Sequence, residues 1–408
     1  MQKYSIKDRC HINTNFGVDT FVGVKCDRSE FSINFPLGFR VSDDEEGLRR
    51  DILLLFTSIA ETTRRKESVV SKRSSGFEVS GFPIAAYLFL IADYFEHGYY
   101  KEKEVHYQVE NRGRINWGRT IKTQKPYVQD NGAYYLKFVT RRNPVSENEL
   151  ITLIHEYCVY DSFAKIGWLF TCSMPKKPRI KLNIKLFKTI IHDKLQQTFN
   201  DDDKSRFNSM LAILDGLSDP EAPLNFQYGT NRFEYVWEAL IDKVYGINGK
   251  EEYFPKTTWK LAEGSYDNAV LEPDTIMIWN SNVYVLDAKY YKYGVTSKPW
   301  DLPESTSINK QITYGEYIAE QDKFKKKHGD SFVVYNAFLM PFSSKDTQFV
   351  RHVGEAVSNW KENTKTYECI QGVLIDVKHL MSITTRQNEV EIMQLARCIE
   401  SALDKSEI

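Results

Sequence analysis

The chain has 408 residues, of which 42% are hydrophobic and 27% are charged, and its formal net charge is −1. This length allows two domains that each bury a core, and the composition is that of an ordinary soluble globular protein. The near-neutral charge argues against a protein whose whole surface attracts nucleic acid.

Membrane and metal-cluster interpretations are poor. No apolar run reaches membrane-spanning length, and the first residues lack the apolar core of a signal peptide. The six cysteines form no C-x-x-C pair, and the one-turn spacing of His155 and Cys158 is more often core packing than a metal site. We therefore expect a cytoplasmic protein that does not contact a membrane.

The first part of the chain predicts a mixed α+β region. We expect strands at residues 12–24, 31–35 and 134–139, and helices at residues 48–63 and 83–96. Ser146 and Glu149 form a capping box for a further helix that runs through Tyr160.

Basic residues are concentrated in two segments. Residues 111–142 contain eight Lys and Arg against Asp130 alone, and residues 176–194 contain seven against Asp193. Such segregation lets one face meet phosphates while the molecule stays neutral, although an ordinary solvated face remains the alternative. The candidate DNA-binding residues here are Arg112, Arg114, Arg119, Lys122, Arg141, Arg142, Lys176, Lys177 and Arg179.

Two proline-containing breaks, at residues 174–178 and 218–223, divide the chain. Between them, residues 180–199 predict a basic amphipathic helix that the acidic run 201–203 ends. We predict three regions: residues 1–174 for DNA recognition or partner docking, residues 175–225 as a basic helical connector, and a third domain at residues 226–408.

The third domain begins with an amphipathic helix that ends at Gly246. Its apolar residues follow the helical period, and Glu234 and Glu238 flank the apolar stripe. Either glutamate is placed to reach the end of a neighbouring strand as a metal ligand. For Glu234 the alternative is a capping box with Asn231, and for Glu238 it is a solvated side chain, so Glu238 is slightly preferred.

A hairpin follows, formed by residues 275–279 and 283–286 around Asn280 and Ser281. A two-residue loop would place Asp274 opposite Asp287, whereas a three-residue loop would shift the register by one. Asp287 and Lys289 are two residues apart on a strand, so they point to the same face.

Two neighbouring carboxylates repel each other unless a cation lies between them, and Mg²⁺, or Mn²⁺ in its place, suits their oxygen ligands. The two acids raise the pKa of the lysine, which favours an electrostatic role over that of a general base. The spacing therefore predicts a metal-dependent nuclease site, against the alternative of a surface hairpin with acidic ends.

Residues 308–318 predict a helix with polar groups on one side, where Lys310 and Gln311 are placed to approach the DNA backbone or a metal-bound water. A surface Lys–Gln pair is the alternative. Further strands are expected at residues 332–340 and 370–376, and a closing helix at residues 389–403. The order helix, strand, strand, helix, strand is typical of the core of a superfamily of metal-dependent nucleases.

The chain resembles the LlaJI-type restriction endonucleases, which are relatives of McrC-type nuclease subunits. The residues that carry the resemblance are 112–121 (RGRINWGRTI), 228–230 (YGT), 233–238 (FEYVWE), 273–274 (PD), 286–291 (LDAKYY) and 309–311 (NKQ). One departure is that Gln311 and Tyr314 are three residues apart, whereas related nucleases often have Q-x-x-x-Y.

The resemblance implies a PD-(D/E)xK domain at residues 226–408, with a central mixed sheet flanked by helices. It implies DNA cleavage with Mg²⁺ in a restriction-modification system for phage defence. Asp274, Asp287 and Glu238 would hold the metal, and Lys289 would stabilise the transition state. It also implies double-stranded DNA as substrate and a cognate DNA methyltransferase as functional partner. A McrB-like AAA+ GTPase and a second copy of the chain are further partner options.

Two other functions remain open from the sequence. One is a repair or recombination nuclease that acts on DNA ends or flaps. The other is a DNA-binding assembly subunit that keeps the fold without catalysis, against which the presence of Asp274, Asp287 and Lys289 counts.

Overall fold

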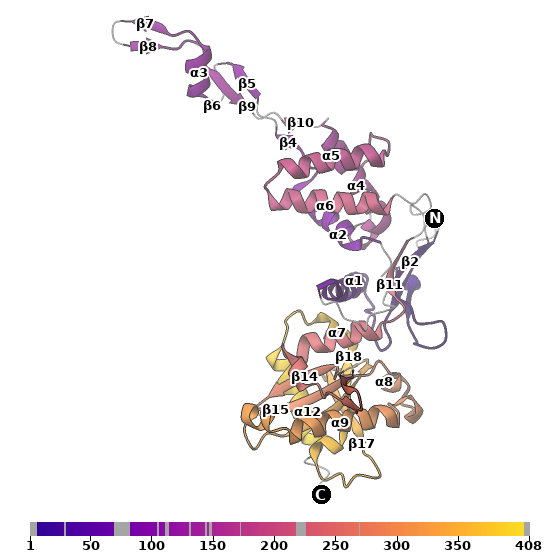
Figure 1. Cartoon of the computed structure of the whole chain (residues 1–408). Helices are drawn as coiled ribbons and strands as arrows, with labels where there is room; N and C mark the ends of the chain where they lie inside the picture. The colour runs from indigo at the N-terminus through magenta and orange to yellow at the C-terminus, as the bar shows by residue number, and fades with distance from the viewer. Residues whose placement is uncertain are drawn as a thin grey trace. The chain divides into compact units, whose positions relative to one another are not determined.

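The structure is a computed structural model of the chain (Figure 1). It describes residues 6–27, 30–68, 82–103, 106–110, 114–129, 132–142, 145–146, 149–171, 173–217, 226–268 and 270–403. The chain divides into two compact units: the first joins Met1–Gly81 to Leu224–Ile408, and the second is Phe82–Pro223. The second unit is thus an insertion in the sequence of the first. The bounds of these two units differ from those of the three regions predicted from the sequence, 1–174, 175–225 and 226–408.

A four-stranded sheet in the first unit joins the N-terminal strands to the strand that precedes helix α7. Its order is β1-β3-β2-β11. The strands are β1 (Cys10–Ile12), β2 (Val22–Asp27), β3 (Glu30–Phe35) and β11 (Phe226–Thr230). Gly23 lies opposite Gly229 in the antiparallel pair β2–β11. A Cβ at Gly23 would lie 2.1 Å from the Tyr228 carbonyl oxygen, so this close approach requires glycine.

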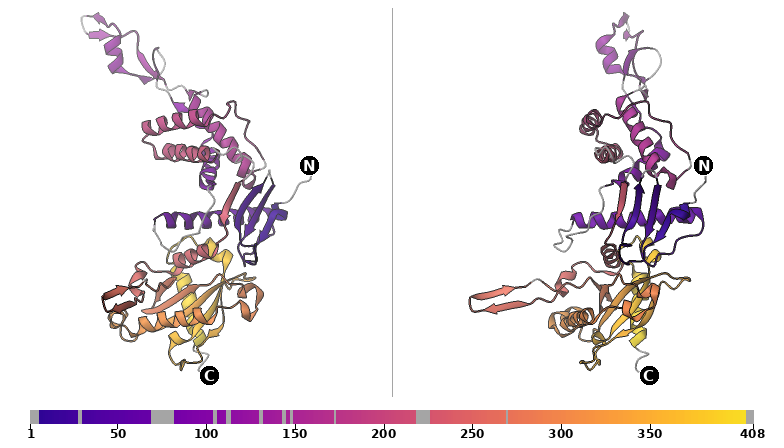
Figure 2. Two further views of the ribbon diagram at one scale, coloured as in Figure 1. Left: turned by 45° about the vertical axis from the view of Figure 1, so that its right-hand side comes forward. Right: turned by 90° about the vertical axis from the view of Figure 1, so that its right-hand side faces the viewer.

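The larger sheet of the first unit has the order β14-β15-β16-β18-β17 (Figures 1 and 2). Its strands are β14 (Thr275–Trp279), β15 (Asn282–Ala288), β16 (Val334–Phe342), β17 (Val350–Ala356) and β18 (Ile370–Asp376). The three central strands are parallel, and the two edge strands are antiparallel to their neighbours. The sheet is therefore mixed, and its central strands are nearly continuous apolar runs because both faces are covered.

Helices cover both faces of this sheet. Val283 and Val285 pack with Tyr314 of α9 (Ser305–Glu320) on one face. Tyr284 points to the other face, where its hydroxyl donates to Glu400 of α12 (Glu389–Leu403) at 2.5 Å. The remaining elements of this unit are η1 (Ile6–Arg9), α1 (Glu45–Ser68), α7 (Glu234–Tyr245), η3 (Lys250–Tyr253), α8 (Tyr293–Thr296), η4 (Pro299–Asp301), α10 (Asp322–His328), η5 (Thr366–Glu368) and α11 (Val377–Ser382).

A second hairpin extends from the first unit, as the right-hand view of Figure 2 shows. It consists of β12 (Thr258–Leu261) and β13 (Gly264–Asp267), and all of its residues are exposed. Trp259 lies directly opposite Tyr266. This hairpin was not among the strands expected from the sequence.

The second unit contains four packed helices. The chain between the first and second of these helices forms several small sheets. The helices are α2 (Ile84–His97), α4 (Leu150–Ile166), α5 (Ile184–Gln197) and α6 (Asp201–Gly216). The shorter elements are β4 (Glu102–Lys103), β5 (His106–Val109), β6 (Arg114–Ile115), α3 (Trp117–Thr123), β7 (Tyr127–Gln129), β8 (Gly132–Tyr134), β9 (Val139–Arg142), β10 (Val145–Ser146) and η2 (Gly167–Leu169). A buried ion pair ties α6 to α2, with Arg206 Nε 2.7 Å from Asp93 Oδ2.

The predicted mixed α+β fold, with a central mixed sheet flanked by helices, is confirmed. Several local predictions were wrong. The strand expected at 134–139 is divided between β8 and β9, and Ser146 lies in β10, so it does not cap α4. The acidic run at 201–203 begins α6, where carboxylates favour the positive end of the helix dipole, instead of ending the preceding helix.

In the described part of the chain, no helix is both long enough and apolar enough to cross a membrane.

Candidate active site

The hairpin β14–β15 brings the two predicted carboxylates to the same end of the sheet. Asn280 and Ser281 both have positive φ, at 48° and 68°, which matches the tight turn that suits the twist of paired strands. Trp279 pairs with Asn282, so the loop has two residues, which decides between the two loop lengths that the sequence left open. Continuing this register places Asp274 opposite Asp287, and Asp274 Oδ2 accepts the Ala288 N–H at 3.1 Å.

Like charges act on Asp274. Loss of hydration raises the pKa of its carboxyl well above the usual range. The negative charges of Asp287 and Glu238 raise it further, while Lys289 opposes them. A cation bound here would relieve this repulsion.

Lys289 supplies a positive charge beside these acids. Its Nζ lies 2.6 Å from Asp287 Oδ2, and the side chain is 20% exposed. Burial alone would lower the pKa of this ammonium, but Asp287 and Asp274 outweigh burial, so the pKa is raised. The direction is the one expected from the sequence, and it keeps the lysine protonated.

The two glutamates of α7 differ in their partners. Glu234 is the first residue of the helix, and it accepts from Arg232 Nε at 2.7 Å. The N-cap is Phe233, which makes no side-chain cap bond, so the expected capping box with Asn231 does not form. Glu238 lies one turn further along and interacts electrostatically with Asp274. Glu238 is therefore the glutamate that the structure associates with the carboxylate pair.

Helix α9 supports the backbone of strand β15, which carries Asp287, and of the segment before β14, which carries Asp274. Gln311 is 1% exposed and its Nε2 donates to the Val285 carbonyl at 2.7 Å. The Tyr314 hydroxyl donates to the Glu272 carbonyl at 3.1 Å. This placement differs from the expected approach of Gln311 to DNA. Lys310 is exposed on the same helix, with its ammonium 5.6 Å from the Tyr314 ring centroid.

Lys250 also contacts the candidate site and was not predicted from the sequence. The Lys250 ammonium donates to the Asp274 carbonyl and, at 2.7 Å, to Asp242 Oδ1. Asp242 lies on α7, one turn after Glu238. Lys250 begins the short helix η3, and no pattern in the sequence marks its pairing with Asp242.

The donor set fits a hard divalent cation. Two facing carboxylates offer only oxygen atoms, and Mg²⁺ is commonly held by one or two carboxylates with waters completing the shell. Within the described residues, no three acidic, histidine or cysteine side chains form a ready metal cluster. The acidic group here is therefore the pair Asp274 and Asp287, on which the charge of Glu238 also acts.

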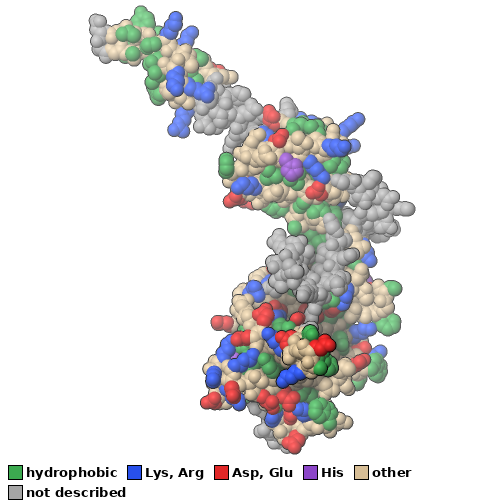
Figure 3. Space-filling model, in the orientation of Figure 1, with side chains coloured by type: hydrophobic (Ala, Val, Ile, Leu, Met, Phe, Trp, Pro, Cys, Tyr) green, Lys and Arg blue, Asp and Glu red, His purple; other side chains and the backbone are tan. Residues whose placement is uncertain are grey.

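Most of the predicted DNA-binding residues lie in the second unit. Arg114 begins β6, and Arg119 and Lys122 are exposed on α3, where Figure 3 shows clustered basic side chains. Lys176, Lys177 and Arg179 are exposed between α4 and α5, and Arg179 pairs with Glu156 at 3.3 Å. Arg141 and Arg142 belong to β9, and Arg112 lies outside the described residues.

Comparisons with known proteins give a consistent family. The model of the LlaJI restriction endonuclease family matches residues 21–358. The type II restriction enzyme BsuMI component YdjA of Bacillus subtilis (strain 168) is 26% identical in an alignment of 317 positions that covers 73% of this chain. The match spans 66% of that relative, slightly less than two thirds of its length.

A solved structure is also similar. It is the half-complex from a tetradecameric assembly of Thermococcus gammatolerans McrB AAA+ hexamers with bound McrC. The matched chain has 16% identity and a TM-score of 0.37, and the match covers 93% of this chain and 82% of that one. The family match covers most of the chain and includes Asp274, Asp287 and Lys289. The chain therefore belongs to the LlaJI restriction endonuclease family.

Proposed function

We propose that this protein is the nuclease component of a DNA restriction system and that it hydrolyses phosphodiester bonds of double-stranded DNA with Mg²⁺. The observation that carries the proposal is the hairpin β14–β15, whose register sets Asp274 opposite Asp287 with Lys289 paired to Asp287. Membership of the LlaJI family supports it. We assign the domain to the PD-(D/E)xK type, with Asp274, Asp287 and Lys289 as its motif residues.

The chain's own groups divide the work. Asp274 and Asp287 would hold the metal, and Glu238 would complete the shell from α7. Bound Mg²⁺ would supply Lewis-acid polarisation of the phosphate and of the attacking water. Lys289 remains protonated beside Asp287, so its charge stabilises negative charge that builds on the phosphate in the transition state. Gln311 and Tyr314 hold the backbone two residues before Asp287 and two residues before Asp274.

Partners follow from the same proposal. A cognate methyltransferase would protect host DNA from this activity. A second copy of the chain would supply a second active site for the other DNA strand. A McrB-like AAA+ GTPase would gate cleavage, with the second unit as the docking region. Direct reading of DNA sequence by the second unit is the competing role, and both leave the catalytic assignment unchanged.

The test is cleavage of supercoiled plasmid by the purified chain with Mg²⁺. Asp274→Asn, Asp287→Asn and Lys289→Met should each lower the rate by roughly 10²-fold or more, since each removes a ligand or the charge stabiliser. Asp267→Asn, on the exposed hairpin β12–β13, is the matched control and should cleave normally. Near-normal cleavage by Asp287→Asn would overturn the site assignment.

Loss of folding is excluded by a second measurement on the same variants. Asp274→Asn removes one of several like charges, so its thermal unfolding temperature should equal or exceed that of the wild type.

Cutting at a few sites without nucleotide would rule out an obligatory motor. Degradation only after linearisation would instead identify a nuclease that acts on ends.

A further inference from the structure

Tyr290 follows Lys289 directly and is 6% exposed. Its hydroxyl oxygen accepts the backbone N–H of Leu37 at 2.6 Å, and its backbone carbonyl accepts from Asn15 Nδ2 at 3.4 Å. Both partners belong to the N-terminal segment of the first unit. Tyr290, which is next to the candidate catalytic lysine, is thus bound by a segment far earlier in the sequence. Leu37 precedes it by 253 residues.

The same tyrosine also contacts helix α7. Its ring centroid lies 5.3 Å from that of Phe233 and 6.3 Å from that of Trp237. The Leu339 carbonyl accepts both the Lys289 N–H at 2.9 Å and the Trp237 Nε1–H at 3.1 Å. Because Trp237 precedes Glu238, the backbones that carry the lysine and the glutamate are joined through these contacts.

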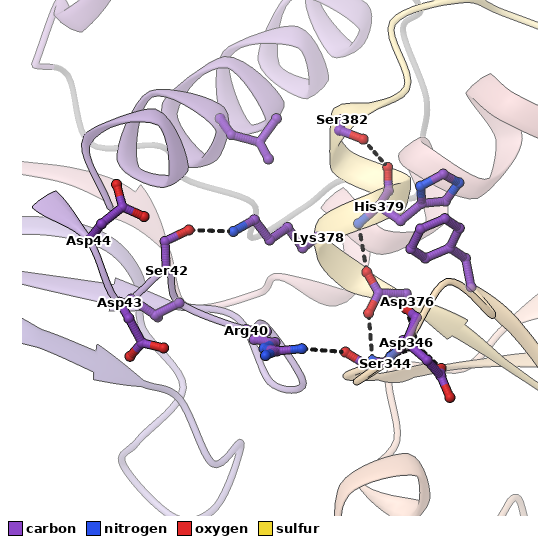
Figure 4. A pocket seen from close by; sticks show the side chains of 13 residues that line it. Arg40, Ser42, Asp43, Asp44, Ser344, Asp346, Asp376, Lys378, His379 and Ser382 are labelled. Carbon is purple, nitrogen blue, oxygen red and sulfur yellow. Dashed lines mark hydrogen bonds between the residues drawn. The ribbon is translucent and has the colours of Figure 1, made fainter. Parts of the chain in front are cut away.

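The N-terminal segment is itself fixed at the carboxyl ends of β16 and β18. Gly38 lies against the Phe342 backbone, with φ of +76°. Arg40 donates to the carbonyls of Ser344 and Lys345, both at 3.4 Å. Lys378 donates to Ser42 at 2.8 Å across a pocket of about 540 Å³ (Figure 4).

We propose that Tyr290 is a positioning residue, through whose hydroxyl the N-terminal segment fixes Lys289 and, through Trp237, the helix that carries Glu238. The inference rests on the proposed nuclease function. It makes residues 36–40 part of the catalytic apparatus. The rival explanation is ordinary core packing, in which the hydroxyl contributes to stability alone.

The hydrogen bond between the Leu37 N–H and the Tyr290 hydroxyl can be removed by a substitution at either residue. Tyr290→Phe removes the acceptor and keeps the ring. Leu37→Pro removes the donor, and proline suits this position: residues 36–39 form a turn closed by Phe39 N–H to the Pro36 carbonyl at 3.1 Å, with positive φ at Gly38. Tyr284→Phe is the control, because it removes a buried hydroxyl bond, to Glu400, from the strand β15 that precedes Lys289.

In plasmid cleavage, kcat of Tyr290→Phe should fall roughly tenfold, while KM for DNA stays at the wild-type value. Tyr284→Phe, which is the same substitution at another buried tyrosine, should keep the wild-type kcat. The double variant Leu37→Pro/Tyr290→Phe should be no slower than Leu37→Pro, since both single changes break one bond.

Two results would overturn the inference. One is a wild-type kcat in Tyr290→Phe, and the other is an equal fall of kcat in Tyr284→Phe, which would show a general effect of stability. If neither the wild type nor Tyr284→Phe cleaves, the proposed function fails instead. The coupling between the two residues can then still be measured from the thermal unfolding of the two single variants and the double variant. If the losses of stability in the single variants add up in the double variant, Leu37 and Tyr290 are not coupled.

Discussion

Asp274 illustrates how a single residue can oppose the stability of the unit that holds it. Its carboxyl loses hydration and faces the charges of Asp287 and Glu238, while the charge of Lys289 opposes them. Such an arrangement raises the free energy of the folded protein, and a bound cation would lower it. Stability gained by neutralising a carboxylate and activity lost by the same change are therefore expected together.

His155 is a second residue whose ionisation opposes folding. It is fully buried in the second unit, and its Nδ1 accepts the Tyr100 N–H at 3.0 Å. Burial lowers the pKa of its imidazole to about 4, and the Arg206 charge lowers it too, while Asp93 acts in the opposite direction. In the unfolded chain the pKa is the ordinary 6.5.

Acidification should therefore destabilise the protein through His155. Because the folded pKa is the lower one, the unfolded chain binds the proton first, and stability is lost as pH falls from 6.5 towards 4. Between pH 7 and pH 5 the free energy of unfolding should fall by about 2 kcal/mol more in the wild type than in His155→Gln. Glutamine keeps an acceptor for Tyr100. Denaturant unfolding at both pH values measures this, and parallel losses in the two proteins would refute it.

At the scale of the elements, helix α9 supports the backbone of the candidate site. Gln311 and Tyr314 are three residues apart and so share the face that meets the sheet. Each binds a carbonyl two residues before a candidate metal ligand: Val285 before Asp287, and Glu272 before Asp274. The helix thus fixes both halves of the site through the backbone.

Neighbouring residues of α9 should separate this support from DNA contact. Gln311→Leu leaves the buried Val285 carbonyl without its donor, so the free energy of unfolding should fall by about 1–3 kcal/mol, with DNA affinity unchanged. Lys310→Ala should leave stability unchanged and weaken DNA binding. Chemical denaturation and a DNA-binding titration on both variants measure these effects. Weaker DNA binding by Gln311→Leu at full stability would restore the DNA contact expected from the sequence.

Elements defined by local patterns could be predicted from the sequence. The register of β14–β15 follows from the turn residues Asn280 and Ser281, and α12 was predicted at its observed bounds because its apolar period is regular. The edge strand β17 was not predicted, and the strand expected at 134–139 was misplaced. The link between Leu37 and Tyr290 could not be predicted, because no local pattern encodes a contact between such distant residues.

At the scale of the molecule, the basic residues of the second unit are the candidates for phosphate contact. Replacing Arg114, Arg119 and Lys122 by Gln should weaken binding to all DNA sequences and reduce the slope of log affinity against log salt by up to about 3. The matched control replaces Lys325, Lys326 and Lys327 of α10, in the first unit, by Gln. Fluorescence anisotropy over a salt series measures both slopes. An unchanged slope in the first variant would return these residues to an ordinary solvated face.

The insertion of the second unit has a consequence for synthesis on the ribosome. Val24 of β2 pairs with Tyr228 of β11, which is 228 − 24 = 204 residues later in the chain. At about 5–20 residues per second, β2 waits roughly 10–40 s before its partner strand is made. During that time its edge offers unpaired backbone groups to other nascent chains. The second unit is completed in this interval, so it can fold before the first unit is complete.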